Sequence, residues 1–439
     1  MKFTNKALPL VVALGLSSQV NAAKTENPIL TGFLPVYKTL PQDYDLNKLT
    51  HLIYFSLIPS GDGSFSWTSG RDSLAMYNTF QDLKAKRGGG PTKIILSIGG
   101  TDAVGSGGYN TIAADPATTQ LFVNRVKDIL DLWGADGVDI DWEKWLRTKE
   151  DSDNHENFLK ALSETLKPAG YTIFTDVPAS NWNGQWFNPK ASEYVDYIQP
   201  MAYTFSGSWS STTEHHSSLA QSKGALSYWV GRGIPKEKLV LGVPFYGVSF
   251  GGASAPGQSF TGVSSLGATP DFKDLKVAIS SGDYTHSAEG DPKGPYIYST
   301  TKNEIIFYND SSTLAQKGKM VVEEEYAGAM VWELGQDDNE GTLINSLSNS
   351  IFPNGVTPIY DTKSNIKGLK IQQTNDSFHI SADSKFNFQI LNSTGRVIQS
   401  STYSHNNELN FSSAKLPQGS YYLRLSFSNN QQIVKSFQK

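Results

Sequence analysis

The chain has 439 residues, of which 38% are apolar and 18% charged, so it can build a large enzyme domain plus a further module and is too apolar to be disordered. Its 37 basic and 42 acidic residues give a formal net charge of -5, which offers no broad cationic surface and argues against nucleic acid as a partner. The absence of cysteine excludes disulfides, thiolate metal sites and a catalytic thiol.

The first 22 residues have the pattern of a secretory signal peptide. Lys2 and Lys6 precede the apolar run 7–16, and Val20-Asn21-Ala22 is a small-residue cleavage pattern. The apolar run is about half of the ~20 residues that a membrane-spanning helix needs. We therefore expect a signal peptide over residues 1–22, a secreted bacterial protein and no insertion into a membrane.

Eight short runs rich in β-branched and aromatic residues follow. Several are apolar at both odd and even positions, as strands covered on both faces are, and stretches with a helical period separate them. This alternation predicts a parallel (β/α)8 barrel; the alternative is a doubly wound open sheet. The runs span residues 29–37, 49–58, 93–98, 137–142, 171–177, 195–203, 239–246 and 327–334.

The stretch 117–133 illustrates the predicted helices. Asp115 is placed to cap it and Pro116 to occupy its first helical position. Its apolar residues form one stripe, which we expect to face the sheet. They are Leu121, Phe122, Val126, Ile129, Leu130 and Trp133.

The fourth predicted strand carries an unusual set of acids. Asp139, Asp141 and Glu143 alternate with apolar residues, so they share one face at about 7 Å per step. On a barrel strand that face is the interior, and Glu143 stands at the carboxyl end, where active sites of this fold lie. Two such charges ~6 Å apart would repel by roughly 2.8 kcal/mol, about two pKa units, at an effective dielectric near 20. One acid would then stay protonated beside an ionised one, as glycosidic cleavage requires.

The segment 136–143 resembles the DxxDxDxE signature of glycoside hydrolase family 18 chitinases. Further family motifs resemble, in chain order, segments 97–100 (SIGG), 199–203 (QPMAY), 244–247 (PFYG) and 328–333 (GAMVWE). The resemblance covers about residues 28–350. It implies a retaining enzyme that cleaves β-1,4 bonds between N-acetylglucosamine units of chitin or chito-oligosaccharides, without metal or cofactor. In that family the substrate's own 2-acetamido carbonyl is the nucleophile, and an oxazolinium ion forms.

The resemblance also implies residue roles. Glu143 would protonate the glycosidic oxygen, and Asp141 would orient and stabilise the oxazolinium, with Asp139 lying deeper and sharing the proton of Asp141. Tyr203 would donate a hydrogen bond to the acetamide oxygen, and Trp332 would form the apolar floor under the sugar.

Six further residues are candidates for binding substrate. Tyr246 belongs to the seventh-strand motif, whereas Met201 and Gln199 either line the cleft or pack inside the barrel. Trp182, Trp186 and Trp209 lie in polar loops after the fifth and sixth strands. Each is either a stacking platform for sugars or a loop anchor packed against the barrel.

Two positions depart from the family pattern. Thr204 stands where Asp is frequent after the sixth-strand Tyr, and a neutral side chain there removes a negative charge near the acid. Val248 stands where Arg is common, which puts a contact at the cleft wall in doubt.

Other interpretations of the sequence are open to test. The acids could be a solvated strand face or a calcium site, although an EF-hand loop needs Gly where Lys144 stands. Segment 247–251 matches the GxSxG pattern of serine hydrolases around Ser249. Within the family, the alternatives are an endo-β-N-acetylglucosaminidase acting on the chitobiose core of N-glycans and a chitin-binding lectin. The presence of Glu143 favours catalysis over a lectin.

The remaining segments complete the predicted organisation. A (β/α)8 catalytic domain is expected over residues 23–352, with an insertion at about 248–305 between the seventh and eighth strands, and a linker over 353–365. Residues 366–439 alternate polar and apolar residues, which predicts a small antiparallel β-sandwich. The tail resembles the C-terminal sorting domains of bacterial type IX secretion, with a chitin-binding module or a spacer as alternatives. We expect a monomer.

Overall fold

The computed structural model describes residues 28–438 except for several short segments. The segments outside the description are 42–43, 68–71, 89, 102–107, 144–145, 288–293, 354, 357–368, 374–376, 393–396, 402–407 and 428–431. The predicted signal peptide and most of the predicted linker therefore lie outside the described residues, as do Lys144 and part of the insertion.

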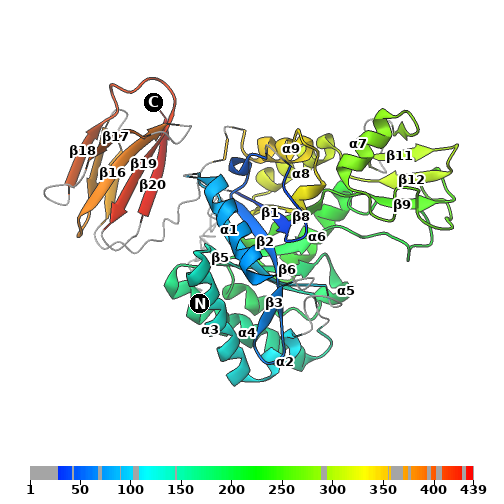
Figure 1. Ribbon diagram of the computed structural model, residues 1–439, viewed down its shortest axis with the longest axis horizontal. Coiled ribbons are helices and arrows are strands. Elements are labelled where there is room, and N and C mark those ends of the chain that lie inside the picture. Colours follow the sequence, from blue (N-terminus) through cyan, green and yellow to red (C-terminus); the bar gives the residue numbers. More distant parts are fainter. Residues whose placement is uncertain are drawn as a thin grey trace, which may run out of the picture.

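Parallel strands lie at the centre of the N-terminal part (Figure 1). They form a nearly closed sheet in the order β7-β6-β5-β4-β2-β1-β13-β8. A bridge between Ile198 and Leu239 brings the two ends of this order together. The predicted (β/α)8 barrel is confirmed, and the open-sheet alternative is wrong. Its strands are β1 (Ile29–Pro35), β2 (His51–Pro59), β4 (Lys93–Gly100), β5 (Gly137–Trp142), β6 (Thr172–Pro178), β7 (Tyr197–Met201), β8 (Val240–Pro244) and β13 (Gly328–Trp332), with the short β3 (Phe65–Trp67) paired to β2.

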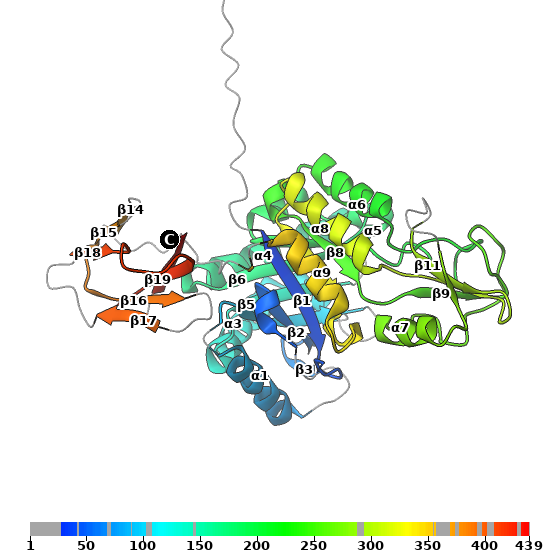
Figure 2. The ribbon, with the colours of Figure 1, turned by 90° about the horizontal axis from the view of Figure 1, so that it is seen from above.

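Helices surround the strands, and α8 and α9 lie side by side on the outside of the barrel (Figure 2). The helices are α1 (Ser73–Arg87), α2 (Tyr109–Ala114), α3 (Pro116–Trp133), α4 (Lys149–Leu166), α5 (Asn181–Gly184), α6 (Leu219–Gly231), α8 (Ser311–Glu323) and α9 (Thr342–Ile351).

Helix α3 begins as its sequence predicts. The Asp115 side chain accepts a hydrogen bond from the Thr118 amide at 2.9 Å, and Pro116 is the first helical residue. Phe122, Val126, Leu130 and Trp133 of the predicted stripe are buried and Ile129 is half-buried, but Leu121 is 44% exposed. Leu121 is turned about 100° around the helix from the fully buried Phe122, which places it at the edge of the apolar face.

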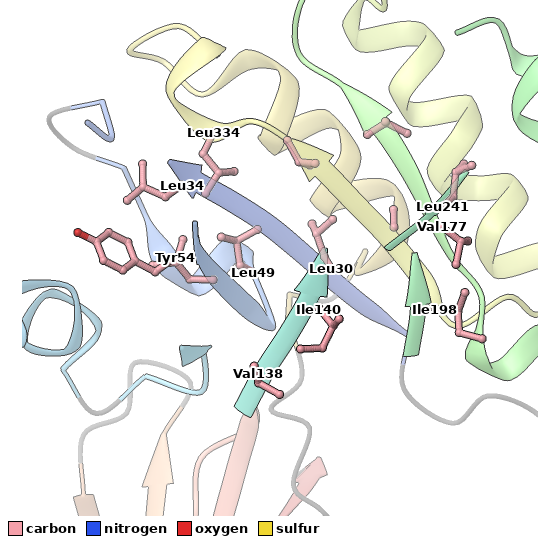
Figure 3. Close-up of a cluster of buried hydrophobic side chains, with 14 of the residues drawn as sticks. Leu30, Leu34, Leu49, Tyr54, Val138, Ile140, Val177, Ile198, Leu241 and Leu334 are labelled. Carbon is pink, nitrogen blue, oxygen red and sulfur yellow. The ribbon is translucent and has the colours of Figure 1, made fainter. Parts of the chain in front are cut away.

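Strand alternation divides the core into two layers. Val138 and Ile140 of β5 point outward into the large apolar layer between sheet and helices, where Figure 3 shows them with Leu30 and Leu241. Asp139, which stands between them on the strand, points into the barrel. The barrel interior has its own smaller cluster, formed by Ile29, Phe33, Ile53, Phe55, Ile95, Phe174, Val240, Ala327 and Met330.

An insertion follows β8, as predicted. It consists of an antiparallel sheet in the order β10-β11-β12-β9 and the helix α7. Two of its strands, β11 and β12, pair with each other in antiparallel register. Their bounds and those of the other elements are β9 (Val248–Gly251), α7 (Phe272–Ser280), β10 (Thr285–His286), β11 (Tyr296–Ser299) and β12 (Glu304–Phe307).

The C-terminal part forms two antiparallel sheets, in the orders β14-β15-β18 and β17-β16-β19-β20. Phe378 and Phe411 from one sheet and Phe388, Leu423 and Leu425 from the other share one apolar core. The predicted small β-sandwich is therefore confirmed. Its strands are β14 (Lys370–Gln373), β15 (Ser377–Ser381), β16 (Phe386–Asn392), β17 (Val397–Ser401), β18 (Glu408–Ser412), β19 (Ser420–Phe427) and β20 (Gln432–Gln438). Within the described residues, none of the helices has the length and apolar character to cross a bilayer.

Candidate active site

The acids of β5 lie inside the barrel rather than on a solvated face. Asp139 is fully buried and Asp141 is 3% exposed, whereas Glu143, just beyond the end of β5, is half-buried. The Ser97 hydroxyl of the neighbouring strand donates a hydrogen bond to Asp139 Oδ2 at 2.7 Å. The acids of β5 thus lie in a row that runs from the centre of the barrel to the carboxyl end of the strand.

A cleft of about 940 Å³ is lined in part by Asp141 and Glu143. It lies at the carboxyl ends of the strands, the position expected for an active site of this fold. It is lined by residues of β1, β5, β6, β7 and β13 and of the segments that follow β4, β5, β6, β7 and β8. They are Phe33, Thr101, Asp141, Trp142, Glu143, Asp176, Pro178, Ala179, Ser180, Trp182, Asn183, Met201, Tyr203, Thr204, Phe205, Trp209, Tyr246 and Trp332.

The structure brings together most of the residues singled out from the sequence. Eight of them line the cleft: Asp141, Glu143, Met201, Tyr203, Tyr246, Trp182, Trp209 and Trp332. Asp139 and Gln199 lie beneath it, fully buried. Gln199 is therefore a packed interior residue: its side-chain oxygen accepts a hydrogen bond from Thr31 at 2.8 Å.

The eleventh residue, Trp186, lies elsewhere. It is half-buried and packs against the large apolar core, and it is not among the described residues that line the cleft. Of the two roles considered for Trp186, a stacking platform for sugars and a loop anchor, this packing favours the loop anchor. Trp182 and Trp209, by contrast, line the cleft with 73% and 66% of their surface exposed.

Burial governs the protonation of the acids. It raises the pKa of Glu143 to about 7 and that of Asp139 to about 7. The pKa of Asp141 is raised well above its ordinary value, first by burial and then by the negative charges of Glu143 and Asp139. The sequence predicted that repulsion between acids would hold a proton near neutral pH. The direction agrees, but desolvation is the larger cause.

Sequence analysis missed a fourth acid, Asp176 of β6, which lines the cleft and is 5% exposed. Gln199 links it to the acids of β5, because its side-chain amide lies 3.2 Å from Asp176 Oδ1 and 3.4 Å from Asp139 Oδ1. The only signal in the sequence was that Asp176 is the one charged residue of the fifth predicted strand. Phe33, Thr101, Asn183 and Phe205 were missed as well.

Trp332 is held by aromatic contacts at one side of the cleft. Its ring centroid lies 5.4 Å from that of Phe33 and 5.0 Å from that of Phe55, the second contact being edge to face. These contacts fix the indole plane at the end of β13.

A comparison of the sequence with family models agrees with this arrangement of cleft residues. Residues 21–337 match the model of the glycosyl hydrolases family 18. The chain belongs to this family. Residues 374–439 match the model of the secretion system C-terminal sorting domain, and the family 18 chain therefore carries such a domain at its C-terminus.

Curated relatives of this family 18 chain are named as chitinases. It is 31% identical over 326 residues to chitinase A1 of Niallia circulans, covering 65% of this chain and 46% of that protein. It is 29% identical over 337 residues to chitotriosidase-1 of Mus musculus, covering 70% of each. The chain thus spans about half the length of chitinase A1 and about two thirds of chitotriosidase-1.

Solved structures share the fold. Chitinase ChiW of Paenibacillus sp. str. FPU-7 superposes with a TM-score of 0.67 at 24% identity, over 74% of this chain and 33% of that one. A class V chitinase from Nicotiana tobaccum superposes with a TM-score of 0.66 at 22% identity, over 74% of this chain and 99% of that one.

The two departures from the family 18 pattern occupy different environments. Thr204 lines the cleft with a left-handed backbone (φ 56°), and its hydroxyl forms a short hydrogen bond with the Tyr246 hydroxyl. Its amide donates to His216 Nδ1 at 3.4 Å. Val248 is buried in an apolar cluster that also contains Tyr246, and it is not among the described residues that line the cleft.

The described residues of this family 18 chain show neither a serine nucleophile at Ser249 nor a metal site. The Ser249 hydroxyl donates a hydrogen bond to the Gly267 carbonyl at 2.5 Å inside the insertion, so it is not presented as a nucleophile. His215 and His216 stack with ring centroids 5.7 Å apart. No group of three or more metal-ligating side chains occurs among the described residues.

Proposed function

We propose that this family 18 protein is a secreted chitinase that cleaves β-1,4 bonds between N-acetylglucosamine units with retention of configuration. The observation that carries the proposal is that Glu143, Asp141, Tyr203 and Trp332 line one cleft at the carboxyl ends of the barrel strands. The curated relatives named as chitinases support the substrate class.

Glu143 is the proposed general acid. A carboxyl group must be protonated to donate to the glycosidic oxygen, and burial raises the pKa of Glu143 to about 7, so the proton is present in weakly acidic solution. Once ionised, the same group accepts a proton from the water that completes hydrolysis.

The proposed nucleophile is the acetamido oxygen of the substrate, which attacks the anomeric carbon as the bond to the leaving sugar breaks. Asp141 lies between Asp139 and Glu143 along the strand face and stabilises the positive charge of the oxazolinium ion. Tyr203 donates its hydroxyl hydrogen to the acetamide, and Trp332 supports the apolar face of the ring. Water then attacks the same carbon, and configuration is retained. These steps call for no metal or cofactor.

The volume of the cleft, about 940 Å³, suits a chain of several sugars. Trp182 and Trp209 expose large apolar surfaces within it, which suits stacking against successive pyranose rings. Chitin and chito-oligosaccharides are therefore the proposed substrates, bound by a monomer.

Product analysis tests this function. We expect the protein to release short oligomers from chitohexaose and to leave a high-mannose glycopeptide intact, and Glu143→Gln to lose nearly all turnover while still binding chito-oligosaccharides. Asp196→Asn, a carboxylate exchange at the amino ends of β6 and β7, is the matched control, since Asp196 accepts a hydrogen bond from the Ile173 amide far from the cleft lining. Cleavage of the glycopeptide alone would identify an endo-β-N-acetylglucosaminidase, and binding without turnover a lectin.

Export is proposed to use both ends of the chain: a signal peptide cleaved after Ala22 and the C-terminal sorting domain. N-terminal mass spectrometry of secreted protein should find Ala23 first. Deleting residues 359–439 should retain the enzyme inside the cell envelope without lowering its activity or its binding to insoluble chitin. A loss of chitin binding would instead identify the C-terminal part as a binding module.

A further inference from the structure

The loop that carries Trp182 is anchored at both ends by the C-terminal end of α6. This loop, residues 178–187, begins at the end of β6 and contains α5. It supplies a large part of the wall of the cleft, so its conformation decides where that wall lies. The described residues of the loop that line the cleft are Pro178, Ala179, Ser180, Trp182 and Asn183.

The loop has little structure of its own to hold Trp182 in place. Helix α5 is a single turn of four residues, which is too short to be stable by itself. The side chain of Ser180, at its N-cap, accepts no capping hydrogen bond in the part of the chain that the structure describes. A stacking ring that must be ordered when the ligand arrives costs affinity, so contacts with another element are needed to order Trp182 beforehand.

Trp229 of α6 anchors the beginning of the loop. It is fully buried, and its indole N–H donates a hydrogen bond to the Pro178 carbonyl oxygen at 2.9 Å. Its ring contacts that of Phe187 edge to face, with the centroids 5.3 Å apart. Gly184 lies directly on the indole, since a Cβ added there would be 2.9 Å from the Trp229 ring. The loop therefore packs closely against α6.

Arg232, the residue after α6, anchors the end of the loop. Its Nη1 donates to the Gln185 carbonyl oxygen at 3.0 Å, and its Nη2 donates to the Phe187 carbonyl oxygen at 2.7 Å. A guanidinium group is planar and holds its N–H groups in fixed directions, so the two bonds together fix both carbonyl groups. The guanidinium carbon also lies 5.9 Å from the centroid of the Tyr228 ring.

We propose that Arg232 is a positioning residue for substrate binding, which holds the loop so that Trp182 stands ready to stack on a chito-oligosaccharide. This inference rests on the proposed function, because it takes Trp182 as a stacking platform for sugars. Arg232 is not among the described residues that line the cleft, so it acts through the loop and not on the sugar. Its contribution is to binding and leaves the chemistry at Glu143 alone.

A double-mutant cycle tests whether Arg232 acts through Trp182. The variants are Arg232→Met, Trp182→Ala and the two combined, and the measurement is KM and kcat for chitohexaose. Methionine keeps an unbranched side chain but has no N–H group to donate. We expect Arg232→Met to raise KM about fivefold and to leave kcat within twofold. In the combined variant, KM should stay within twofold of Trp182→Ala alone, because no ring is left to position.

Arg87→Met is the matched control. Arg87 at the end of α1 is also half-buried, and its Nη1 donates to the Thr92 carbonyl oxygen at 3.3 Å and to Asp136 Oδ2 at 3.1 Å. These partners precede β4 and β5, at the end of the barrel opposite to the cleft. Urea unfolding measures the stability of both arginine variants. Arg87→Met should lose stability as Arg232→Met does and keep the wild-type KM.

Three results would overturn the proposal: a wild-type KM in folded Arg232→Met, a combined variant whose KM rises by the product of the two single effects, and an equal rise of KM in Arg87→Met. If Arg232→Met does not fold, Arg232→Lys decides, because one ammonium group cannot fix both carbonyl groups. We then expect KM to rise at least twofold, and only when Trp182 is present; a wild-type KM overturns the proposal. Failure of the proposed function is distinguishable, because the wild type would then not cleave chitohexaose.

Discussion

Gly99 of β4 lies directly against the backbone of Asp141 of β5. The two residues are paired in the parallel ladder, and a Cβ added to Gly99 would lie 1.9 Å from the Asp141 carbonyl oxygen. Gly99 also has φ 120°, a conformation that residues with a side chain rarely adopt. The glycine of the third-strand motif therefore permits the close approach that positions Asp141.

Gly99→Ala should consequently abolish turnover and lower the midpoint of thermal unfolding, because the clash is with backbone and cannot be relieved by a rotamer change. Gly224→Ala is the matched control. Gly224 lies inside α6 with no atom within 4 Å of an added Cβ, so alanine there should raise stability by about 1 kcal/mol. Calorimetric unfolding and a chromogenic chitobioside assay measure both effects. Wild-type turnover in Gly99→Ala would contradict the role given to this contact.

The pH dependence of kcat/KM should show an alkaline limb near pH 7. The general acid must be protonated, and burial raises the pKa of Glu143 to about 7, so activity falls as pH rises through that value. A pH profile on a chitobioside substrate measures the limb. A limb near pH 4.5, the ordinary range of a glutamic acid, would show that the site does not desolvate this group.

Glu143 should also make stability depend on pH. Between pH 4.5 and pH 7 the folded state holds a proton that the unfolded state releases, so the free energy of unfolding falls as pH rises. Gln does not titrate, so Glu143→Gln should raise the free energy of unfolding at pH 8 by up to about 3 kcal/mol relative to the wild type. Its melting temperature should thus exceed that of the wild type at pH 8 and approach it at pH 4. An equal difference at both pH values would argue against proton linkage.

The tryptophans should separate into two classes. Trp182→Ala and Trp209→Ala should raise KM for chitohexaose roughly three- to tenfold, with little effect on stability, because these rings are exposed in the cleft. Trp186→Ala should instead lower stability by about 1–3 kcal/mol and leave KM near its wild-type value, because this ring packs against the core. Parallel kinetics and urea unfolding of the three variants test the division; a KM effect confined to Trp186→Ala would reverse it.

Thr204→Asp should move the alkaline limb to higher pH. The new negative charge lies in the same cleft as Glu143 and disfavours its ionised form, so the pKa of the acid rises. Asp also tolerates the left-handed backbone at φ 56° better than a β-branched residue does. Thr204→Asn supplies the same shape without charge and should leave the limb in place. A shift of similar size in Thr204→Asn would assign it to the lost Tyr246 hydrogen bond instead.

The sequence by itself determined the strands and helices of the barrel and their order along the chain. Period-two and period-3.6 patterns are local properties, so the eight strands, the capped start of α3 and the shared face of Asp139, Asp141 and Glu143 could be predicted from neighbours along the chain. The motif resemblance located Tyr203, Tyr246 and Trp332 for the same reason: each motif is contiguous.

Only the tertiary structure decided the properties that depend on packing between distant segments. In the sequence Asp176 is only a single acid within a strand; it joins the site because β6 lies beside β5 and Gln199 connects its carboxyl group to Asp139. Trp182 and Trp186 stand four residues apart in similar loop sequence, yet one lines the cleft and the other packs on the core. Desolvation of Glu143 likewise comes from side chains of several strands, and no local pattern records how much water they exclude.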